Sequence, residues 1–229
     1  MPQMQYEWLL FDADNTILDF NEAQRHALEQ SLLEVGVLFE TAYNQIYDQI
    51  NRSCWRDYEE GKLSKAKLRY QRFQLFFMEI GLQEDPHAFA ESYLLHLSQS
   101  TAMMEGAAEL LSHLGTRYNL ALVTNGIKEV QRSRLALSGL ASHFSYIAIS
   151  DEIGVAKPNP AFFSHVFEEL DQPPKERTLI IGDNLNADIR GGLDFGIHAC
   201  WFNYDQRERY LEVAPTYEIT QLSQLFAFL

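Results

Sequence analysis

The sequence predicts an α/β fold, in which a parallel sheet carries helices on both faces and a second group of helices is inserted after the first strand. Two observations predict it. From residue 106 to 202, helix-like and strand-like segments alternate, as in parallel sheets with right-handed crossovers. Residues 19–102 show helical periodicity and almost no strand signal. We therefore expect a core domain of residues 1–18 and 103–229, and a helical domain of residues 19–102.

The first strand is predicted at Trp8–Phe11, where large apolar residues stand in a row. A short run without polar alternation is typical of a strand that is buried on both faces. Asp12 and Asp14 follow it directly. Ligands bind at the carboxyl ends of strands in open α/β sheets, so this acidic pair is a candidate site. The alternative is that both aspartates only cap a turn or the next helix.

The inserted segment is predicted to hold four helices. The first ends near Gly36 and the second near Gly61. The third ends at Gly81, and Pro86 opens the fourth. The segment has enough aliphatic and aromatic residues for a small core and no low-complexity run, which indicates a domain rather than a linker.

The rest of the chain is predicted to complete the core. The expected strands are residues 118–123, 146–149, 178–181 and 199–202. The expected helices are residues 107–114, 127–137, 160–170 and 186–195. Asn159 is typical of an N-cap and Pro160 of a first helical position, which fixes the start of the third of these helices.

Polar residues recur where several predicted strands end. Thr124, Asn125 and Gly126 follow the second strand. Lys157 follows the third after a loop, and Asp183 follows the fourth. Parallel strands end along one edge of a sheet, so we expect these residues to converge with the acidic pair after the first strand.

The converging residue types suit a metal-assisted reaction on a phosphate. Asp12, Asp14 and Asp183 form a hard-oxygen set suited to Mg²⁺. Without a cation, these carboxylates would repel one another and raise their pKa values. Lys157, with the hydroxyl and amides around residues 124–126, is expected to hold the phosphate.

Composition narrows the class of protein. The chain has 46% hydrophobic residues and a formal net charge of −14, which fits a globular protein and argues against a surface for nucleic-acid polymers or anionic membranes. No apolar run is long enough to span a bilayer, and no signal peptide is recognised, so we expect a cytoplasmic protein. Cys54 and Cys200 are expected to be reduced core residues. The sequence leaves the oligomeric state open.

Four motifs in chain order resemble the haloacid dehalogenase (HAD) superfamily of aspartate-nucleophile phosphatases. They are Asp12–Thr16 (DADNT), Thr124 with Asn125 and Gly126, Lys157 in VAKPNP, and Gly182–Asp188 (GDNLNAD). The resemblance spans essentially the whole chain and implies a Rossmann-like core with a helical cap of the C1 type. One departure is Asn15, where many members carry Gly or Glu, which affects the turn before the insert rather than the chemistry.

The resemblance also implies roles. Asp12 would be the nucleophile that forms an aspartyl-phosphate, and Asp14 the general acid and base. Asp12, Asp14 through its backbone carbonyl, and Asp183 would hold Mg²⁺, with Asp188 behind them. Thr124, Asn125 and Lys157 would bind the phosphate.

Within the superfamily, the stretch NRSCWRDYEEG from Asn51 to Gly61 is most similar to YjjG-type pyrimidine nucleoside 5'-monophosphate phosphatases. In such a cap, Trp55 or Tyr58 would stack on a base and Asn51 or Arg52 would hydrogen-bond to it. The alternative for Trp55 is a place in the core of the cap.

Three other functions stay open. The first is hydrolysis of phosphoglycolate or a sugar phosphate on the same core. The second is a haloacid dehalogenase, which needs no metal-binding acid pair, so Asp14 and Asp183 argue against it. The third is a non-catalytic binding module, against which all the motif residues are present.

Overall fold

The computed structural model describes residues 6–209 and 212–229. The chain forms two compact units. The core unit combines the chain up to Phe20 with Thr101–Leu229, and the helical unit is Asn21–Ser100.

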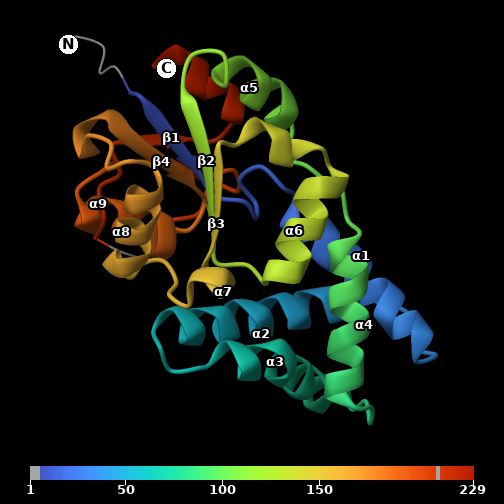
Figure 1. The fold of residues 1–229 in the computed structure, drawn as a ribbon. Helices are drawn as coiled ribbons and strands as arrows, with labels where there is room; N and C mark the ends of the chain where they lie inside the picture. The colour runs from blue at the N-terminus through green and yellow to red at the C-terminus, as the bar shows by residue number, and fades with distance from the viewer. Residues whose placement is uncertain (1–5, 210–211) are drawn as a thin grey trace. The chain divides into compact units, whose positions relative to one another are not determined.

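The core unit is built on a parallel sheet whose order in the described residues is β3-β2-β1-β4-β5-β6 (Figure 1). All five neighbouring pairs are parallel, which confirms the predicted sheet type. The strands are β1 Trp8–Phe11, β2 Asn119–Thr124, β3 Tyr146–Ile149, β4 Thr178–Gly182, β5 His198–Phe202 and β6 Tyr217–Ile219. Because β1 lies between β2 and β4, the residues after it are central to the carboxyl edge of the sheet.

Both faces of the sheet are covered by helices. Leu9 and Phe11 belong to an apolar cluster with residues of α5 (Ala107–Leu114) and α6 (Lys128–Leu137). Leu10, between them in the chain, belongs to a second cluster with residues of α8 (Pro160–Glu169). Burial on both faces explains why β1 is apolar throughout.

Shorter helical elements complete the core unit. They are η1 Leu140–His143, α7 Ser150–Ile153, η2 Lys175–Arg177, η3 Leu185–Arg190, α9 Gly191–Phe195 and η4 Leu222–Ala227.

The predicted helix 186–195 is in fact two segments. Its first part, η3, is a π-helix, followed by α9. The Asn184 side chain accepts bonds from the backbone N–H groups of Asn186 and Ala187, and the Ile189 N–H reaches back five residues to the Asn184 carbonyl at 3.2 Å. The Asn184 side chain thus satisfies the first backbone N–H groups of the segment. The following turn is closed by a five-residue backbone bond, which is the wider hydrogen-bond pattern of a π-helix.

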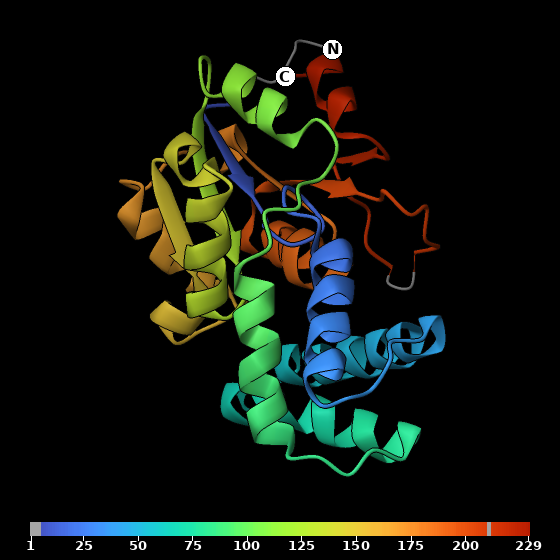
Figure 2. The ribbon, with the colours of Figure 1, turned by 90° about the vertical axis from the view of Figure 1, so that its right-hand side faces the viewer.

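The helical unit consists of four helices in the described residues, as predicted (Figure 2). They are α1 Phe20–Glu34, α2 Thr41–Glu59, α3 Lys65–Ile80 and α4 Pro86–Ser98. Ser64 and Asp85 cap α3 and α4 with their side chains, and Gly81 ends α3 at a φ of 71°, which glycine adopts without strain. An aromatic group of Tyr47, Phe73 and Tyr93 forms part of the interior.

The chain leaves the core unit and returns to it through two adjacent segments. Leu18 bridges Met103 in antiparallel fashion, and the Asp19 N–H donates to the Ala102 carbonyl at 3.0 Å. The Met104 N–H donates to the Ile17 carbonyl at 3.1 Å. We call this pair of segments the stem.

Two further features bear on the sequence predictions. Cys54 and Cys200 are unbridged and buried, as expected. Among the helices of the described ranges, none is both long and apolar enough to cross a membrane.

Candidate active site

A carboxylate cluster lies at the carboxyl ends of β1 and β4. Asp12 follows β1, Asp183 follows β4, and Asp188 lies on η3. Each offers an oxygen atom, and these oxygens all lie within 4.8 Å of one another.

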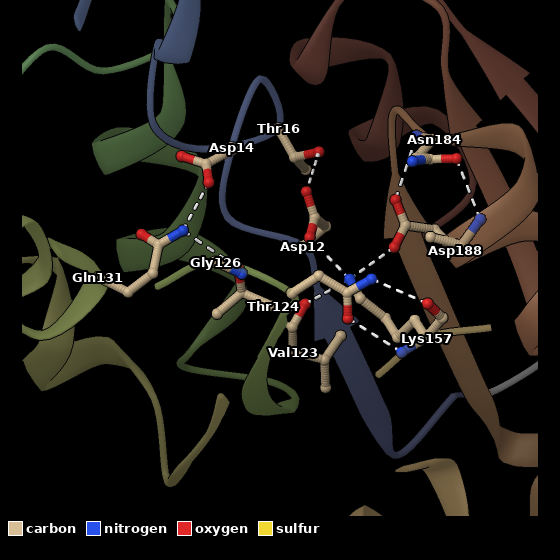
Figure 3. A network of polar contacts seen from close by, with 12 residues as sticks. Asp12, Asp14, Thr16, Val123, Thr124, Gly126, Gln131, Lys157, Asn184 and Asp188 are labelled. Atoms are coloured by element: carbon tan, nitrogen blue, oxygen red, sulfur yellow. Dashed lines mark hydrogen bonds and ion pairs between the residues drawn. The ribbon is translucent and has the colours of Figure 1, made fainter. Parts of the chain in front are cut away.

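Lys157 joins this cluster with a fully buried ammonium group (Figure 3). Its Nζ donates to Asp12 Oδ1 at 2.7 Å, to Asp188 Oδ1 at 2.6 Å and to the Val123 carbonyl at 2.6 Å. All three of its donors are therefore used, which fixes the ammonium group beside the Asp12 carboxylate.

The cluster carries more negative than positive charge, and its pKa values reflect this. Burial, and then the charge of Asp188, raise the pKa of Asp12 well above its ordinary value. Burial and Asp188 also raise the pKa of Asp183, to about 7, against the opposing effect of Arg207. Burial alone would lower the pKa of Lys157, but Asp12 and Asp188 outweigh it and the pKa is raised.

Neighbouring groups fix the orientation of the two later aspartates. The Asn184 N–H donates to Asp188 Oδ2 at 3.1 Å. A Cβ on Gly182 would lie 2.3 Å from that oxygen, so a glycine is needed there. The Asp183 carbonyl accepts bonds from Trp201 Nε1 at 3.0 Å and from Arg207 Nη2 at 3.2 Å, and Arg207 also reaches Asp183 Oδ2 at 3.2 Å.

The loop after β2 contacts both Lys157 and α6. The Asn125 side chain donates to the Lys157 carbonyl at 2.8 Å and accepts from the Lys157 N–H at 2.9 Å, so it holds the backbone of the lysine. Thr124 Oγ1 accepts from the Gly126 N–H and from Gln131 Nε2, both at 3.1 Å. The structure thus brings Asn125 to Lys157 and Thr124 to α6.

The Asp14 carboxylate turns away from the cluster and toward α6 (Figure 3). Gln131 Nε2 donates to Asp14 Oδ2 at 2.5 Å, and Arg134 Nη1 donates to Asp14 Oδ1 at 2.6 Å. Among the described residues, the Asp14 carboxylate is not part of the metal-ligating group.

The four cap residues predicted to read the substrate all lie on α2. Asn51 is buried, and its side chain donates to Gln24 Oε1 and accepts from Arg72 Nη1, both at 2.8 Å. Arg52 pairs with Asp48 at 2.9 Å.

Trp55 and Tyr58 form an edge-to-face pair and pack against the small cluster of Cys54, Leu63 and Leu68. Lys65 Nζ lies 5.0 Å from the centroid of the Trp55 ring and 4.6 Å from that of Tyr58. Trp55 therefore packs against the interior of the helical unit while it remains partly exposed.

The donor set fits a hard divalent cation. The converging atoms are carboxylate oxygens, which such cations prefer, and their surplus negative charge is what a bound cation would neutralise. The raised pKa values of Asp12 and Asp183 express the same surplus.

Comparison with known proteins agrees with this geometry. Residues 6–196 match the family model of the haloacid dehalogenase-like hydrolases. The chain belongs to this family. Its core, with the inserted helices between β1 and β2, has the fold of the HAD superfamily with a C1-type cap.

Full-length relatives lie within this family. The HAD-hydrolase YfnB of Bacillus subtilis is 37% identical over 98% of this chain and 96% of its own length. Its crystal structure, bound to magnesium, superposes with a TM-score of 0.93 over 97% of this chain and 98% of that chain.

Two further relatives have a named activity. The pyrimidine 5'-nucleotidase PynA of Streptococcus pneumoniae is 39% identical over 97% of this chain and 94% of its own length. The pyrimidine 5'-nucleotidase YjjG of Escherichia coli is 31% identical over 97% of both chains.

Sequence reasoning missed several side chains of this site, among them Gln131, Arg134 and Arg207. Gln131 and Arg134 are buried polar residues beside the apolar Val130 and Leu135 on α6, a break in the apolar stripe that can be seen in the sequence. Arg207 lies in the loop after β5, where no motif marks it.

Proposed function

We propose that this chain is a Mg²⁺-dependent phosphomonoester hydrolase that acts through an aspartyl-phosphate on Asp12, with a pyrimidine nucleoside 5'-monophosphate as its substrate. The observation that carries the proposal is the placement of Asp12. Its carboxylate lies 2.7 Å from the Lys157 ammonium group and within the three-carboxylate cluster. This combines a nucleophile with the positive charge that a phosphoryl group needs.

Asp12 and Asp183 would hold the cation together with the Asp14 backbone carbonyl, as the family resemblance implies. The resemblance places Asp188 behind these ligands, and in the structure an Asp188 oxygen joins the same cluster. When bound, Mg²⁺ supplies positive charge that offsets both the carboxylates and the phosphoryl oxygens. Asp188 also accepts a bond from Lys157, so its carboxylate links the metal ligands to the lysine.

The reaction proceeds in two steps, and atoms and protons balance. An Asp12 carboxylate oxygen bonds to phosphorus as the ester P–O bond breaks, and the Asp14 carboxyl gives its proton to the departing alkoxide oxygen. Asp14 then takes a proton from water as the water oxygen bonds to phosphorus and the Asp12–phosphorus bond breaks. The products are an alcohol and inorganic phosphate, and both aspartates return to their starting forms.

The phosphate would be held on the other side by the loop after β2. Lys157 contributes its positive charge, the Thr124 hydroxyl contributes a donor, and the backbone amides around Asn125 contribute further donors. The Asn125 side chain supports this arrangement indirectly, since it holds the Lys157 backbone.

The nucleotide part of the proposal rests on the relatives. Two proteins that match nearly the whole chain are named pyrimidine 5'-nucleotidases. Phosphoglycolate and sugar phosphates are the alternative substrates on the same core. The acidic cluster argues against dehalogenation, which needs no metal-binding acid pair.

The test is phosphate release from pyrimidine and purine nucleotides, phosphoglycolate and sugar phosphates, with Mg²⁺ and with EDTA. We expect metal-dependent turnover that is fastest for UMP, dUMP or dTMP. Turnover led by another ester would remove the nucleotide assignment and keep the hydrolase. No turnover of any ester by folded protein would overturn the proposal.

Asp12→Asn is the control for the nucleophile. We expect its kcat to fall by at least about 10³-fold, because the amide cannot attack phosphorus. Circular dichroism should show an unchanged fold. Retained activity would exclude Asp12 as the nucleophile.

The predicted cap contacts need a separate measurement. Trp55→Ala should change the ratio of kcat/KM between UMP and p-nitrophenyl phosphate by about tenfold if the ring touches the base. An equal loss on both esters, with a lowered Tm, would assign Trp55 to the packing seen on α2.

A further inference from the structure

Helix α6 presents two buried polar side chains to the Asp14 carboxylate. Gln131 and Arg134 are three residues apart and so lie on the same side of the helix. One donates to each Asp14 oxygen, at 2.5 Å to Oδ2 and 2.6 Å to Oδ1. A carboxylate held at both oxygens is confined to one orientation.

The Arg134 guanidinium is held beside the Asp14 carboxylate. Its side chain is fully buried, and Asp14 is the carboxylate with which it pairs in the described parts of the chain. Nη2 also donates to the Asp19 carbonyl at 3.3 Å, which anchors the guanidinium from a second side. Because removing either partner would leave the other charged group without its counter-charge, Arg134 and Asp14 hold each other in place.

Gln131 links Asp14 to Thr124. Its Nε2 donates to both Asp14 Oδ2 and Thr124 Oγ1. The Gln131 amide thus faces Asp14 and Thr124 with its NH₂ group, which is the donor end of the side chain. A Cβ on Gly126 would lie 2.2 Å from Nε2, so the loop after β2 packs directly on this amide.

The same contacts fix the direction of the Thr124 hydroxyl hydrogen. A hydroxyl accepts two hydrogen bonds and donates one. Thr124 Oγ1 already accepts from the Gly126 N–H and from Gln131 Nε2. Its own hydrogen is therefore left to donate, which is what a group that binds phosphate requires.

We propose that Gln131 and Arg134 are positioning residues for proton transfer, because they hold the Asp14 carboxylate in one orientation and Gln131 makes Thr124 a donor. The inference rests on the proposed phosphatase function, in which Asp14 is the general acid and base. Neither residue touches the reacting atoms. Their effect passes through Asp14 and Thr124.

A comparison of two esters with different leaving groups distinguishes a role in proton transfer from a purely structural role. UMP loses a primary alkoxide, which needs the proton of a general acid, whereas p-nitrophenyl phosphate loses a phenolate that needs little protonation. We expect Arg134→Met, which leaves the contact of Gln131 with Thr124 in place, to lower kcat/KM for UMP by about 100-fold and for p-nitrophenyl phosphate by less than about tenfold. Equal losses on both esters, in folded protein, would overturn the proposal.

Arg132→Met is the matched control, since Arg132 lies on the same helix but is exposed and pairs with Glu152. It should leave both rates unchanged. Arg134→Lys keeps the positive charge and serves if Arg134→Met does not fold. Its kcat/KM for UMP should recover in part.

A double variant tests whether Arg134 acts through Asp14. Asp14→Asn combined with Arg134→Met should be no slower on UMP than Asp14→Asn alone. Multiplied losses would show that Arg134 acts elsewhere and would contradict the proposal.

A crystal structure of the Gln131→Met/Arg134→Met variant gives a result that needs no activity. We expect the Asp14 carboxylate in a different or split orientation, and an unchanged orientation would overturn the positioning role. If the wild type hydrolyses neither ester, the proposed function fails, and this structure still decides whether α6 orients Asp14.

Discussion

The core unit and the helical unit each bury a cation, but they balance its charge in different ways. Lys157 in the core lies between the carboxylates of Asp12 and Asp188. Arg72 in the helical unit is equally buried, yet within the described residues no carboxylate lies within 4.0 Å of it. Its Nη1 donates to Asn51 instead.

In the helical unit, the Arg72 guanidinium is surrounded by neutral aromatic and amide groups. The Arg72 guanidinium lies 5.0 Å from the Phe73 ring centroid and 5.3 Å from that of Tyr93. Through Asn51 it connects to Gln24, so one polar chain joins α3, α2 and α1. Such a chain fixes the register of helices that an apolar interior alone would leave free to slide.

The comparison teaches that a charge imbalance alone does not mark a functional site. Arg72 carries a positive charge that no nearby carboxylate balances in the described residues, but only 1% of its surface is exposed. In the core, several like-charged oxygens converge, and 10% of the Asp12 side chain and 14% of the Asp183 side chain remain exposed. The candidate site is therefore distinguished by several carboxylates that lie close together and remain partly exposed to solvent. The buried Arg72 chain has neither property.

The largest expected effect on stability comes from removing Lys157, the cation that carboxylates balance. Lys157→Met should lower the free energy of unfolding by about 3 kcal/mol in EDTA near pH 8, because Asp12 and Asp188 lose their shared counter-charge. Urea denaturation measures this. Lys128→Met, at an exposed position of the same unit, is the control and should change stability by less than about 0.5 kcal/mol. Similar losses in the two variants would refute the comparison.

The second expected effect is a loss of stability as pH rises. The pKa of Asp183 is raised from 3.8 to about 7, so between these values the native state binds more protons than the unfolded state. Stability therefore falls as pH rises through this window, by about 2 kcal/mol from about pH 5 to about pH 7 for metal-free protein.

Urea denaturation in EDTA at several pH values checks this second effect. Asp183→Asn should flatten the fall, and Mg²⁺ should reverse it in the wild type. A stability that rises over this range, after subtraction of the Asp183→Asn curve, would contradict the assigned shift.

The smallest effect on stability is expected from removing Arg72, the cation that has no carboxylate beside it in the described residues. Arg72→Met should change the free energy of unfolding by about 1 kcal/mol or less, because removing a desolvated charge offsets the loss of the bond to Asn51. Asn51→Leu, which leaves the guanidinium in place without its partner, should cost more. A loss for Arg72→Met as large as that for Lys157→Met would show that the two cations are held alike.

The sequence predicted those parts of the site that follow from strand ends. Asp12 and Asp183 each come directly after an apolar strand and Thr124 is the last residue of one, and parallel strands bring such positions to one edge. Gln131 and Arg134 lie 117 and 120 residues from their partner Asp14. Their helix was predicted, but the pairing depends on tertiary structure that local patterns do not contain.

The short elements escaped prediction, and β6 and η3 show why. The strand β6 has only three residues, and its stability comes from pairing with β5 rather than from its own pattern. The π-helix η3 depends on side-chain acceptors at Asn184, whose effect on the turn is not visible as a change in hydrophobic period. In contrast, β1, β3 and α5 have the bounds predicted from their apolar residues.

The stem has a consequence for the folding kinetics of the chain. Leu18 and Met103 bridge each other, and so β1 meets β2 only after residues 21–100 have been looped out. The entropy cost of closing such a loop grows by about 0.6 kcal/mol with each doubling of its length. Helices form from local contacts and fold faster than sheets that pair distant strands. We therefore expect the helical unit to fold first, which would shorten the loop to the two ends of the stem, and the sheet to assemble afterwards.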